Sequence, residues 1–192
     1  MNLSLAQKFI HTGNVPLSKG NMAWTTNVWN DEFKIEFDVI VKTELDAKWT
    51  NIFHLTTSGN EEHKGQRIPA VWANSKRYFH ICFYVDENTY HCIMYNYQLH
   101  LPYHFVISQL YNSEREANYE INVNEKTFHE VINRAPTKFK NVKLFLSDPW
   151  YPSFASYGTL SNFKINDFQT NGNPKQNPKG KYISSLINRT KL

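Results

Sequence analysis

Apolar and polar side chains alternate most clearly between residues 31 and 42. Every second position there is apolar, and charged residues stand between most of them. The apolar positions are Phe33, Ile35, Phe37, Val39 and Val41, and the charged ones include Lys34, Glu36, Asp38 and Lys42. Successive side chains of an extended chain point to opposite faces. The segment is therefore predicted to be a β-strand with one buried face.

Nine further runs have β-like composition, and turn-forming segments such as Ser58-Gly59-Asn60 and Asp86-Glu87-Asn88 divide them. The runs are Trp49–Thr57, Arg67–Ala73, Tyr78–Val85, Tyr90–Tyr97, Tyr103–Tyr111, Asn118–Val123, Thr127–Asn133, Lys140–Ser147 and Thr159–Phe168. No segment shows a convincing helical period. The predicted fold class is all-β, a two-sheet antiparallel jelly-roll sandwich.

The chain has 192 residues, of which 41% are hydrophobic, and no internal repeat, so one core is expected. Residues 1–22 are mixed and polar, and Pro16 and Gly20 break any helix. They are predicted to be a lead-in segment, with a first strand around Met22–Thr26. The sandwich is expected to span residues 23–168, and residues 169–192 to form a basic flexible tail.

The formal net charge of +4 is unevenly distributed. Residues 169–192 hold five bases and no acid, which leaves 16 bases and 17 acids before them. A nearly neutral folded part does not fit a phosphate-binding face, so no nucleic-acid partner is expected. No run approaches the ~20 apolar residues of a membrane span, and residues 1–13 lack the apolar core of a secretory signal.

A rigid aromatic corner, Asp148-Pro149-Trp150-Tyr151-Pro152, lies between two predicted strands. Proline fixes φ on both sides of the ring pair, so little entropy is lost when the rings meet a ligand. Aromatic rings stack on sugars and anchor protein partners. The candidate ligand-binding residues are Trp150, Tyr151, Phe154, Tyr157 and Trp72. For Trp150 an inward orientation that caps the sandwich is the alternative.

Cys82 and Cys92 flank a predicted hairpin turn at residues 86–88. With a three-residue loop, Val85 opposes Thr89 and the two cysteines lie directly opposite each other. Such a cross-strand pair either forms a disulfide or remains two buried thiols. His80 shares their face, so a three-ligand zinc site is a weaker possibility.

Several of these segments together carry a family resemblance. They are residues 32–41, Trp49-Thr50-Asn51-Ile52-Phe53-His54-Leu55-Thr56-Thr57, Gly65-Gln66-Arg67-Ile68-Pro69-Ala70-Val71-Trp72, Tyr119-Glu120-Ile121-Asn122-Val123, and Val142-Lys143-Leu144-Phe145-Leu146-Ser147-Asp148-Pro149-Trp150-Tyr151. Over residues 23–168 the chain resembles laminin-G-like domains of the concanavalin A-like lectin and glucanase superfamily, and among them animal extracellular modules. The resemblance implies a jelly roll that serves adhesion, carbohydrate binding or protein binding, and an extracellular location.

The resemblance also makes a Cys82–Cys92 disulfide an expectation, because extracellular domains commonly contain such bridges. Calcium at the rim is the metal that the family implies, and the candidate acids are Asp86, Glu87 and Asp148. No other cofactor is expected. Where relatives often carry paired cysteines and an acid, this chain has Glu61-Glu62-His63-Lys64-Gly65-Gln66, which departs from the family pattern.

Glucanases of this superfamily use alternating acids on one strand. Glu36-Phe37-Asp38 lacks a third acid, and Glu120 to Glu125 has Asn122 at the centre. The chain is therefore expected not to be an enzyme. The leading hypothesis is a module whose rim loops bind carbohydrate or an extracellular protein. The alternatives are a structural or adhesion module that docks on partner chains, including its own copies, and, third, a glycoside hydrolase.

Overall fold

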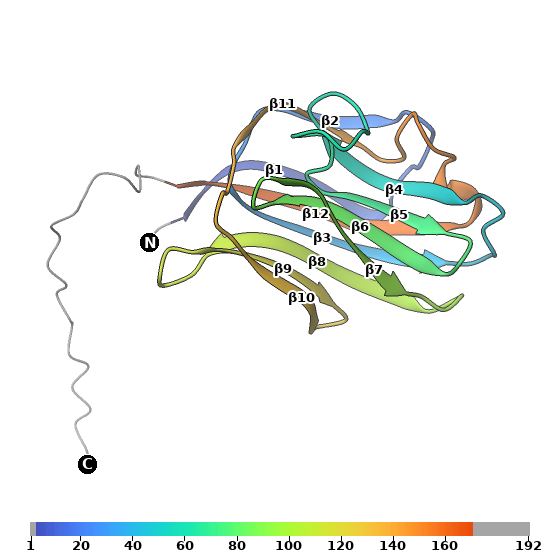
Figure 1. Cartoon of the computed structure of the whole chain (residues 1–192). Helices are drawn as coiled ribbons and strands as arrows, with labels where there is room; N and C mark the ends of the chain where they lie inside the picture. The colour runs from blue at the N-terminus through green and yellow to red at the C-terminus, as the bar shows by residue number, and fades with distance from the viewer. Residues whose placement is uncertain (1–2, 171–192) are drawn as a thin grey trace, which may run out of the picture.

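The computed structural model describes residues 3–170, which form twelve β-strands and one short 3-10 helix (Figure 1). In chain order these elements are β1 (Leu3–Asn14), β2 (Met22–Trp29), β3 (Glu32–Val41), β4 (Trp49–Thr56), β5 (Ala70–Asn74), β6 (Tyr78–Val85), β7 (Asn88–Asn96), β8 (Pro102–Tyr111), β9 (Ala117–Val123), β10 (Lys126–Asn133), β11 (Phe139–Phe145), η1 (Phe154–Ser156) and β12 (Gly158–Thr170). Within this part of the chain, no helix is long and apolar enough to cross a membrane.

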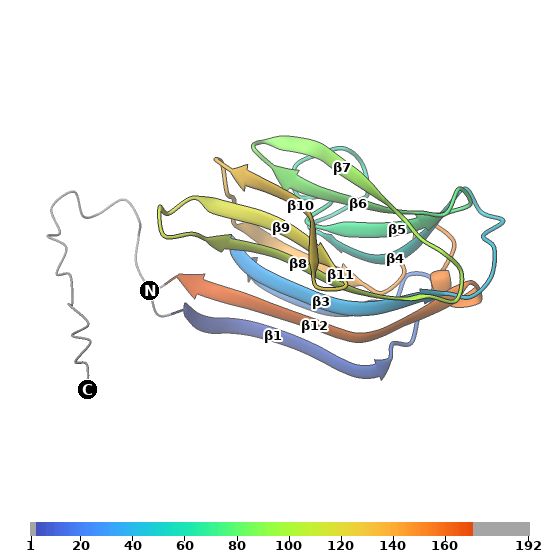
Figure 2. The same ribbon diagram turned by 90° about the horizontal axis from the view of Figure 1, so that it is seen from below.

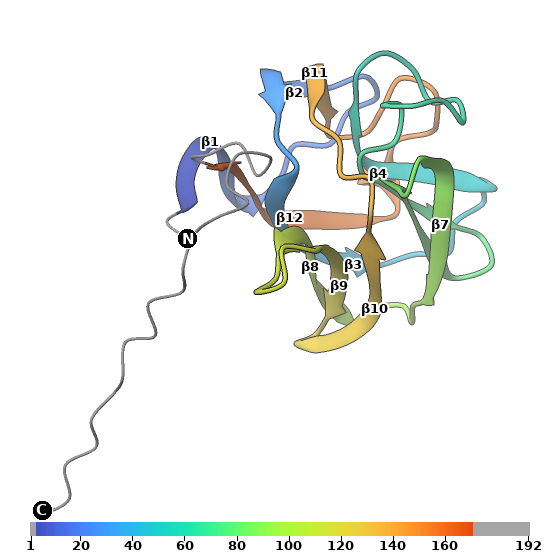
Figure 3. The same cartoon turned by 60° about the vertical axis from the view of Figure 1, so that its left-hand side comes forward.

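The strands form two six-stranded sheets that face each other (Figures 2 and 3). The β3 sheet has the order β1-β12-β3-β8-β9-β10, and the β4 sheet has the order β2-β11-β4-β5-β6-β7. All neighbouring strands in both sheets run antiparallel. The predicted fold class, a two-sheet antiparallel β-sandwich, is confirmed.

The core lies between the sheets and is rich in phenylalanine. The Phe37 ring of β3 stacks on Phe105 with 5.1 Å between the centroids and meets Phe53 of the opposite sheet edge-on at 5.1 Å. All three rings are fully buried. Burying a side chain of this size contributes about 1.5–3 kcal/mol. The alternation predicted for residues 33–41 is present, since every second side chain from Phe33 to Val41 is buried.

The first strand begins earlier than the sequence predicts. Residues 3–14, within the predicted lead-in, form β1 and pair with β12 at the edge of the β3 sheet (Figure 2). An edge strand is held mainly through its backbone, so it needs little apolar alternation, and Ile10 is 45% exposed. At the other end β12 continues to Thr170. The rest of the predicted tail lies outside the described residues.

The β6–β7 hairpin keeps the predicted cysteine register by a different route. Its loop has two residues, Asp86 and Glu87, with φ of 51° and 62°, and Val85 pairs with Asn88, not with Thr89. Two positive φ angles match the turn that suits the twist of a hairpin. A register shift between Phe83 and Val85 compensates for the shorter loop, so the two cysteines still pair.

Candidate functional site

The β4 sheet is buried on both faces in its middle strands. Val71 and Ile81 point into the main core, whereas Trp72 and Cys82 belong to a separate cluster on the outer face. This follows from strand alternation. Every residue of β5 is buried, although the β3 sheet covers only one of its faces. The loops after β4 and β11 and side chains of β7 cover the other face.

A small pocket opens on this outer face. It has a volume of about 90 Å³, which is smaller than the ~300–1,000 Å³ of typical ligand-binding pockets, so it is a shallow depression. Its lining, called the aromatic pocket below, consists of Trp49, Arg67, Trp72, His80, Tyr90 and Tyr151. Four aromatic rings, one guanidinium and one imidazole thus meet from strands β4 to β7 and the two covering loops.

Arg67 supplies the positive charge of the aromatic pocket. Its guanidinium lies 5.3 Å from the ring centre of Trp72 and 5.3 Å from that of Tyr90. Two hydrogen bonds to Asn60 hold it in place, from Nε to the side-chain oxygen at 3.3 Å and from Nη2 to the backbone oxygen at 2.9 Å. Such cation–π contacts contribute about 0.5–1 kcal/mol each at exposed sites.

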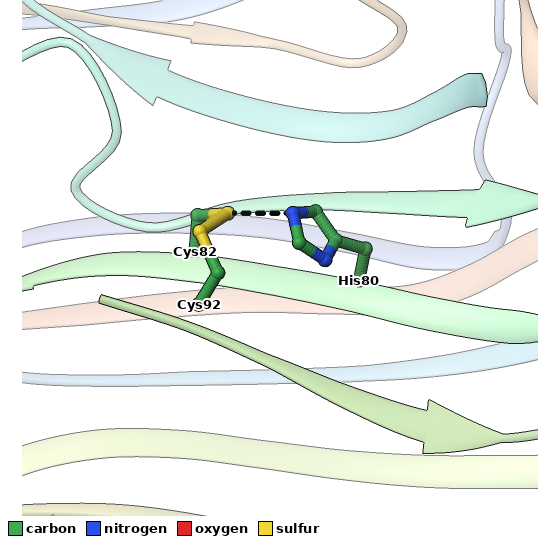
Figure 4. A group of neighbouring side chains, drawn as sticks. All are labelled: His80, Cys82 and Cys92. Atoms are coloured by element: carbon green, nitrogen blue, oxygen red, sulfur yellow. Dashed lines mark hydrogen bonds between the residues drawn. A yellow bond between two sulfur atoms is a disulfide. The ribbon is translucent and has the colours of Figure 1, made fainter. Parts of the chain in front are cut away.

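His80, which lines the aromatic pocket, lies beside a disulfide between Cys82 and Cys92 (Figure 4). His80 Nε2 lies 3.1 Å from Cys82 Sγ. A disulfide sulfur has no proton and only accepts, so Nε2 donates. Burial, followed by the charge of Arg67, lowers the pKa of His80 to about 4. The ring is therefore neutral at neutral pH, and Nδ1 is a free acceptor.

Two polar atoms in the wall of the aromatic pocket have no hydrogen-bond partner within residues 3–170. They are Nδ1 of His80 and Nε1 of Trp72, and both are buried. Trp72 is 3% exposed and His80 is 8% exposed. Nearly all buried polar groups in proteins are paired, so each unpaired one requires an explanation. The first is an acceptor and the second is a donor.

The zinc possibility raised by the cysteines is not supported. In the described part of the chain, the ligand atoms of His80, Cys82 and Cys92 form the one group of three close enough to share a metal ion, within 4.8 Å. The two sulfur atoms are bonded to each other, however. Zinc binds cysteine as the thiolate, so the disulfide removes two of the three ligands.

A buried histidine–aspartate pair supports the aromatic corner. His54 and Asp148 are both fully buried, and Nδ1 of the ring lies 2.9 Å from Oδ2 of the carboxyl group. The other nitrogen, Nε2, meets the backbone oxygen of Gln66. Because a carbonyl oxygen only accepts, Nε2 donates to it, and Nδ1 shares a proton with Asp148. His54, near the end of β4, thus connects Gln66 in the loop after β4 with Asp148 in the loop after β11.

The remaining oxygen of Asp148 fixes the corner itself. Oδ1 accepts hydrogen bonds from the backbone nitrogens of Trp150 and Tyr151, at 3.1 and 3.0 Å. The backbone nitrogen of Asp148 donates to Asn51 Oδ1 at 2.8 Å. The two rings that follow are therefore held in fixed positions. His54 touches the edges of Trp72 and Trp150, each with 5.4 Å between ring centres.

The predicted ligand-binding residues separate into two groups. Trp72 and Tyr151 line the aromatic pocket, and Trp150 is 42% exposed beside it. Phe154 is fully buried in the main core, so the prediction that it contacts a ligand is wrong. Gly158 explains this, because a Cβ there would lie 2.5 Å from the Phe154 ring. Tyr157 packs against the core, and its hydroxyl donates to Asp46, away from the aromatic pocket.

The predicted calcium ligands do not come together. Asp148 is buried and bonded to His54. Asp86 accepts from Arg134, with 3.2 Å between Nη1 and Oδ2, and Glu87 is exposed in the β6–β7 turn. Both carboxylate oxygens of Asp148 already accept hydrogen bonds within the aromatic corner or from His54. These three acids do not form a calcium site in this structure.

Sequence reasoning missed Trp49, Arg67 and Tyr90 as site residues. Trp72 of β5 pairs with Asn51 of β4 and with His80 of β6, which brings the middle strands together around it. Trp49 is the first residue of the predicted strand Trp49–Thr57, and Arg67 is the first residue of the Arg-Ile-Pro-Ala segment. The sequence therefore placed both residues in predicted strands but did not indicate that their side chains meet. Their convergence depends on strand order, which a sequence pattern does not specify.

The fold and site define a β-sandwich with an aromatic pocket on the outer face of one sheet. No family model and no curated protein sequence matches the chain. Among solved structures, it is similar to a Trypanosoma rangeli sialidase in complex with 2,3-difluorosialic acid, with 13% identity and a TM-score of 0.51. That match covers 73% of this chain and 21% of the sialidase chain.

The chain is also similar to the receptor binding domain of botulinum neurotoxin D. There the identity is 9% and the TM-score 0.50, over 86% of this chain and 42% of the other. Thus the chain spans about a fifth of the sialidase and less than half of the neurotoxin domain. At identities this low, the two likenesses show a shared sandwich fold alone.

Proposed function

We propose that this chain is a non-enzymatic, laminin-G-like carbohydrate-binding module and that the aromatic pocket holds a sugar ring. The observation that carries the proposal is the composition of the pocket wall. Aromatic rings of Trp49, Trp72, Tyr90 and Tyr151 surround one guanidinium, next to two unpaired polar atoms. The C–H faces of sugars stack on such rings, while polar groups fix the orientation of the ligand.

The unpaired atoms fit a hydroxyl group. A hydroxyl accepts one hydrogen bond and donates another, so it complements the Trp72 donor and the His80 acceptor. Leaving a buried polar group unpaired costs about 1–3 kcal/mol, and a ligand that pairs it recovers this energy. Both atoms are shielded from solvent, so a sugar reaches them when side chains above the Trp72 ring, such as Arg67, are displaced.

The similar structures support this proposal at the level of the fold. One is a sialidase that holds a sialic acid derivative, and the other is a receptor binding domain. Each of these two proteins is thus named for a ligand or a receptor that it binds. Neither match carries an activity to this chain, because the shared part is 21% of the sialidase.

The acids that resemble a glucanase motif support a non-enzymatic role. Glu36 bonds to Lys34 at 2.7 Å, and this hydrogen bond lowers the pKa of Glu36, whereas a general acid needs a raised one. Asp38 pairs with His104, and Glu120 accepts from Asn122. All these acids lie on the β3 sheet. Replacing Glu120 and Glu125 with glutamine should leave any trace of glycan cleavage unchanged.

An extracellular location, expected from the resemblance, belongs to the same proposal. The disulfide between Cys82 and Cys92 supports it, because such bonds persist in oxidising compartments. Mass measurement before and after reduction of protein secreted from cells tests this point. A secreted protein with two free thiols would contradict it.

A glycan array tests the binding proposal directly. Wild-type protein should give specific signals, and Trp49→Ala and Tyr151→Ala should each lower them by about tenfold, which corresponds to the loss of one stacking contact. Phe128→Ala is the matched control, because Phe128 is 41% exposed but lies on β10 of the other sheet. Equal losses in all three variants would overturn the site. Silence together with a self-associated state in sedimentation would favour the assembly role instead.

A further inference from the structure

The aromatic pocket is the middle one of three depressions on the outer face of the β4 sheet. Tyr151 also lines a wider depression beside residues 58–66, together with Trp150. Trp49 also lines a third depression, which extends toward Asn74 and Met94. Since each of these two rings borders two depressions, the three hollows are neighbours, with the aromatic pocket in the middle; they are called the line of depressions below.

Each outer depression has an exposed apolar side chain that the fold does not bury. Trp150 is 42% exposed at one end, and Met94 is 52% exposed at the other. Tyr90, in the middle, is 45% exposed. Each of these side chains borders one of the three depressions, so a ligand that lies along them would cover apolar surface that the fold leaves exposed. Trp150 is also held by a fixed backbone, so little entropy is lost when it meets a ligand.

The charges along this line differ between its ends. Lys48 and Lys76 line the depression next to Trp49, and both are exposed without an ion pair among residues 3–170. Glu61 lines the depression next to Trp150. Arg67 adds a positive charge in the middle. Charges about 4 Å apart interact by about 1 kcal/mol in water, enough to orient a ligand but not to hold it.

We infer that this line of depressions binds a linear acidic oligosaccharide of three or more sugar units, with an acidic sugar at the Trp49 end. The inference rests on the proposed function and specifies its ligand. The aromatic pocket takes one ring, and Trp150 and Met94 each support a further ring on either side. A carboxylate and a sulfate fit the two lysines equally well, because both present oxygen anions to ammonium groups.

The test uses an array of matched series, from disaccharides to hexasaccharides. Hyaluronan and polygalacturonate fragments carry carboxylates, chondroitin sulfate fragments add sulfates, and chitin fragments are uncharged. We expect tetrasaccharides and hexasaccharides of an acidic series to bind at least about tenfold more tightly than the disaccharide of that series. Chitin fragments of equal length should bind more weakly, and the tighter acidic series identifies the anionic group.

Two variants separate chain length from charge. Trp150→Ala should weaken hexasaccharide binding by about tenfold and leave disaccharide binding unchanged. Lys48→Ala combined with Lys76→Ala should remove the preference for acidic fragments over chitin. The matched control is Lys8→Ala with Lys126→Ala, since both of these lysines are exposed on the β3 sheet.

The outcomes are distinguishable. Equal binding of disaccharides and hexasaccharides, or binding of chitin as tight as that of the acidic series, overturns this inference and leaves the proposed function standing. Array signals confined to disaccharides would likewise overturn this inference and leave the proposed function standing. A blank array overturns both the inference and the proposed function.

Discussion

The two sheets carry the same pair of side chains in opposite surroundings. On the β4 sheet, His54 and Asp148 are fully buried at 2.9 Å. On the β3 sheet, His104 and Asp38 lie 2.6 Å apart, but their side chains are 44% and 31% exposed. The first pair is covered by two loops and holds the aromatic corner, whereas the second pair faces solvent. Identical chemistry is thus a structural anchor on one sheet and a surface contact on the other.

The outer faces differ in the same way. On the β3 sheet polar side chains pair with one another, as Glu120 does with Asn122 at 2.7 Å. On the β4 sheet the outer face is aromatic, and Trp72 and His80 have polar atoms without partners in the described chain. Buried polar atoms without partners also occur on the β3 sheet, at Asn118 and His129, so they do not by themselves separate the two sheets. The aromatic pocket on the outer face of the β4 sheet is the feature that makes this face the better candidate for a binding site.

The largest expected effect comes from breaking the buried pair. Asp148→Ala leaves the His54 ring without its partner and removes the acceptor of two backbone amides, so we expect a loss of about 3–5 kcal/mol in the free energy of unfolding. Asp38→Ala is the matched control and should cost at most about 1 kcal/mol, because exposed ion pairs contribute little. Urea denaturation measures both. Similar losses in the two variants would contradict the comparison.

The second prediction concerns pH. Burial lowers the pKa of His80 from 6.5 to about 4, so the unfolded chain takes up this proton before the folded one does. The stability that neutral His80 contributes is complete above pH 6.5 and is lost as pH falls to about 4, by about 3 kcal/mol. His80→Gln should remove this loss, as measured by thermal unfolding between these pH values.

Asp167 on the β3 sheet provides the opposite control. Burial raises its pKa from 3.8 to about 6, so protonation stabilises the folded state as pH falls through that range. The unfolding free energy of Asp167→Asn should therefore fall more steeply than that of the wild type as pH is lowered. That of His80→Gln should fall less steeply. Parallel pH profiles for both variants would be inconsistent with these assignments.

The third prediction compares two hairpins that share one turn geometry. The β6–β7 turn at Asp86 and Glu87 and the β9–β10 turn at Asn124 and Glu125 both have two positive φ angles. Only the first is cross-linked among the described residues, by a disulfide that spans 10 positions. Replacing both cysteines with serine should cost about 2–3 kcal/mol.

Hydrogen exchange locates the effect of this replacement. Amides of β6 and β7 should exchange faster in the double-serine variant, while those of β9 and β10 should change only as much as global stability does. An equal acceleration in both hairpins beyond the global change would show that the disulfide does not act locally.

The smallest expected effect is that of Trp150→Ala on stability. Trp150 is 42% exposed, and its ring meets those of Phe145 and His54 edge-on. We expect a change of at most about 1 kcal/mol in the unfolding free energy. Urea denaturation measures it. A larger loss would mean that Trp150 caps the sandwich, the alternative raised by the sequence.

The fold was more predictable than the site. The alternation in residues 33–41 corresponds to β3, which buries one face, and the apolar run Tyr78–Val85 corresponds to β6, which buries both faces. Buried faces require apolar side chains, so both strands left a clear pattern in the sequence. β1 carries a weak pattern because it is an edge strand held by its backbone. The cysteine register was correct even though the turn was one residue shorter, since a register shift offset the difference.

The site depended on strand order and loop packing. Phe154 looked like a loop residue but is buried, because the glycine at position 158 allows its ring to pack closely. Arg67 reaches Trp72 and Tyr90 only because β5, β6 and β7 are neighbours. Such contacts between distant segments follow from tertiary structure and not from periodicity.

One NMR titration tests the central claim most directly. Indole N–H signals of the five tryptophans are followed while the oligosaccharide with the strongest array signal is added. The Trp72 signal should move downfield as its unpaired N–H gains an acceptor, and Trp49 should also shift, while the buried Trp29 stays unchanged. Unmoved Trp72 and Trp49 signals at saturation, with shifts confined to Trp24 or Trp29 of β2, would contradict the account.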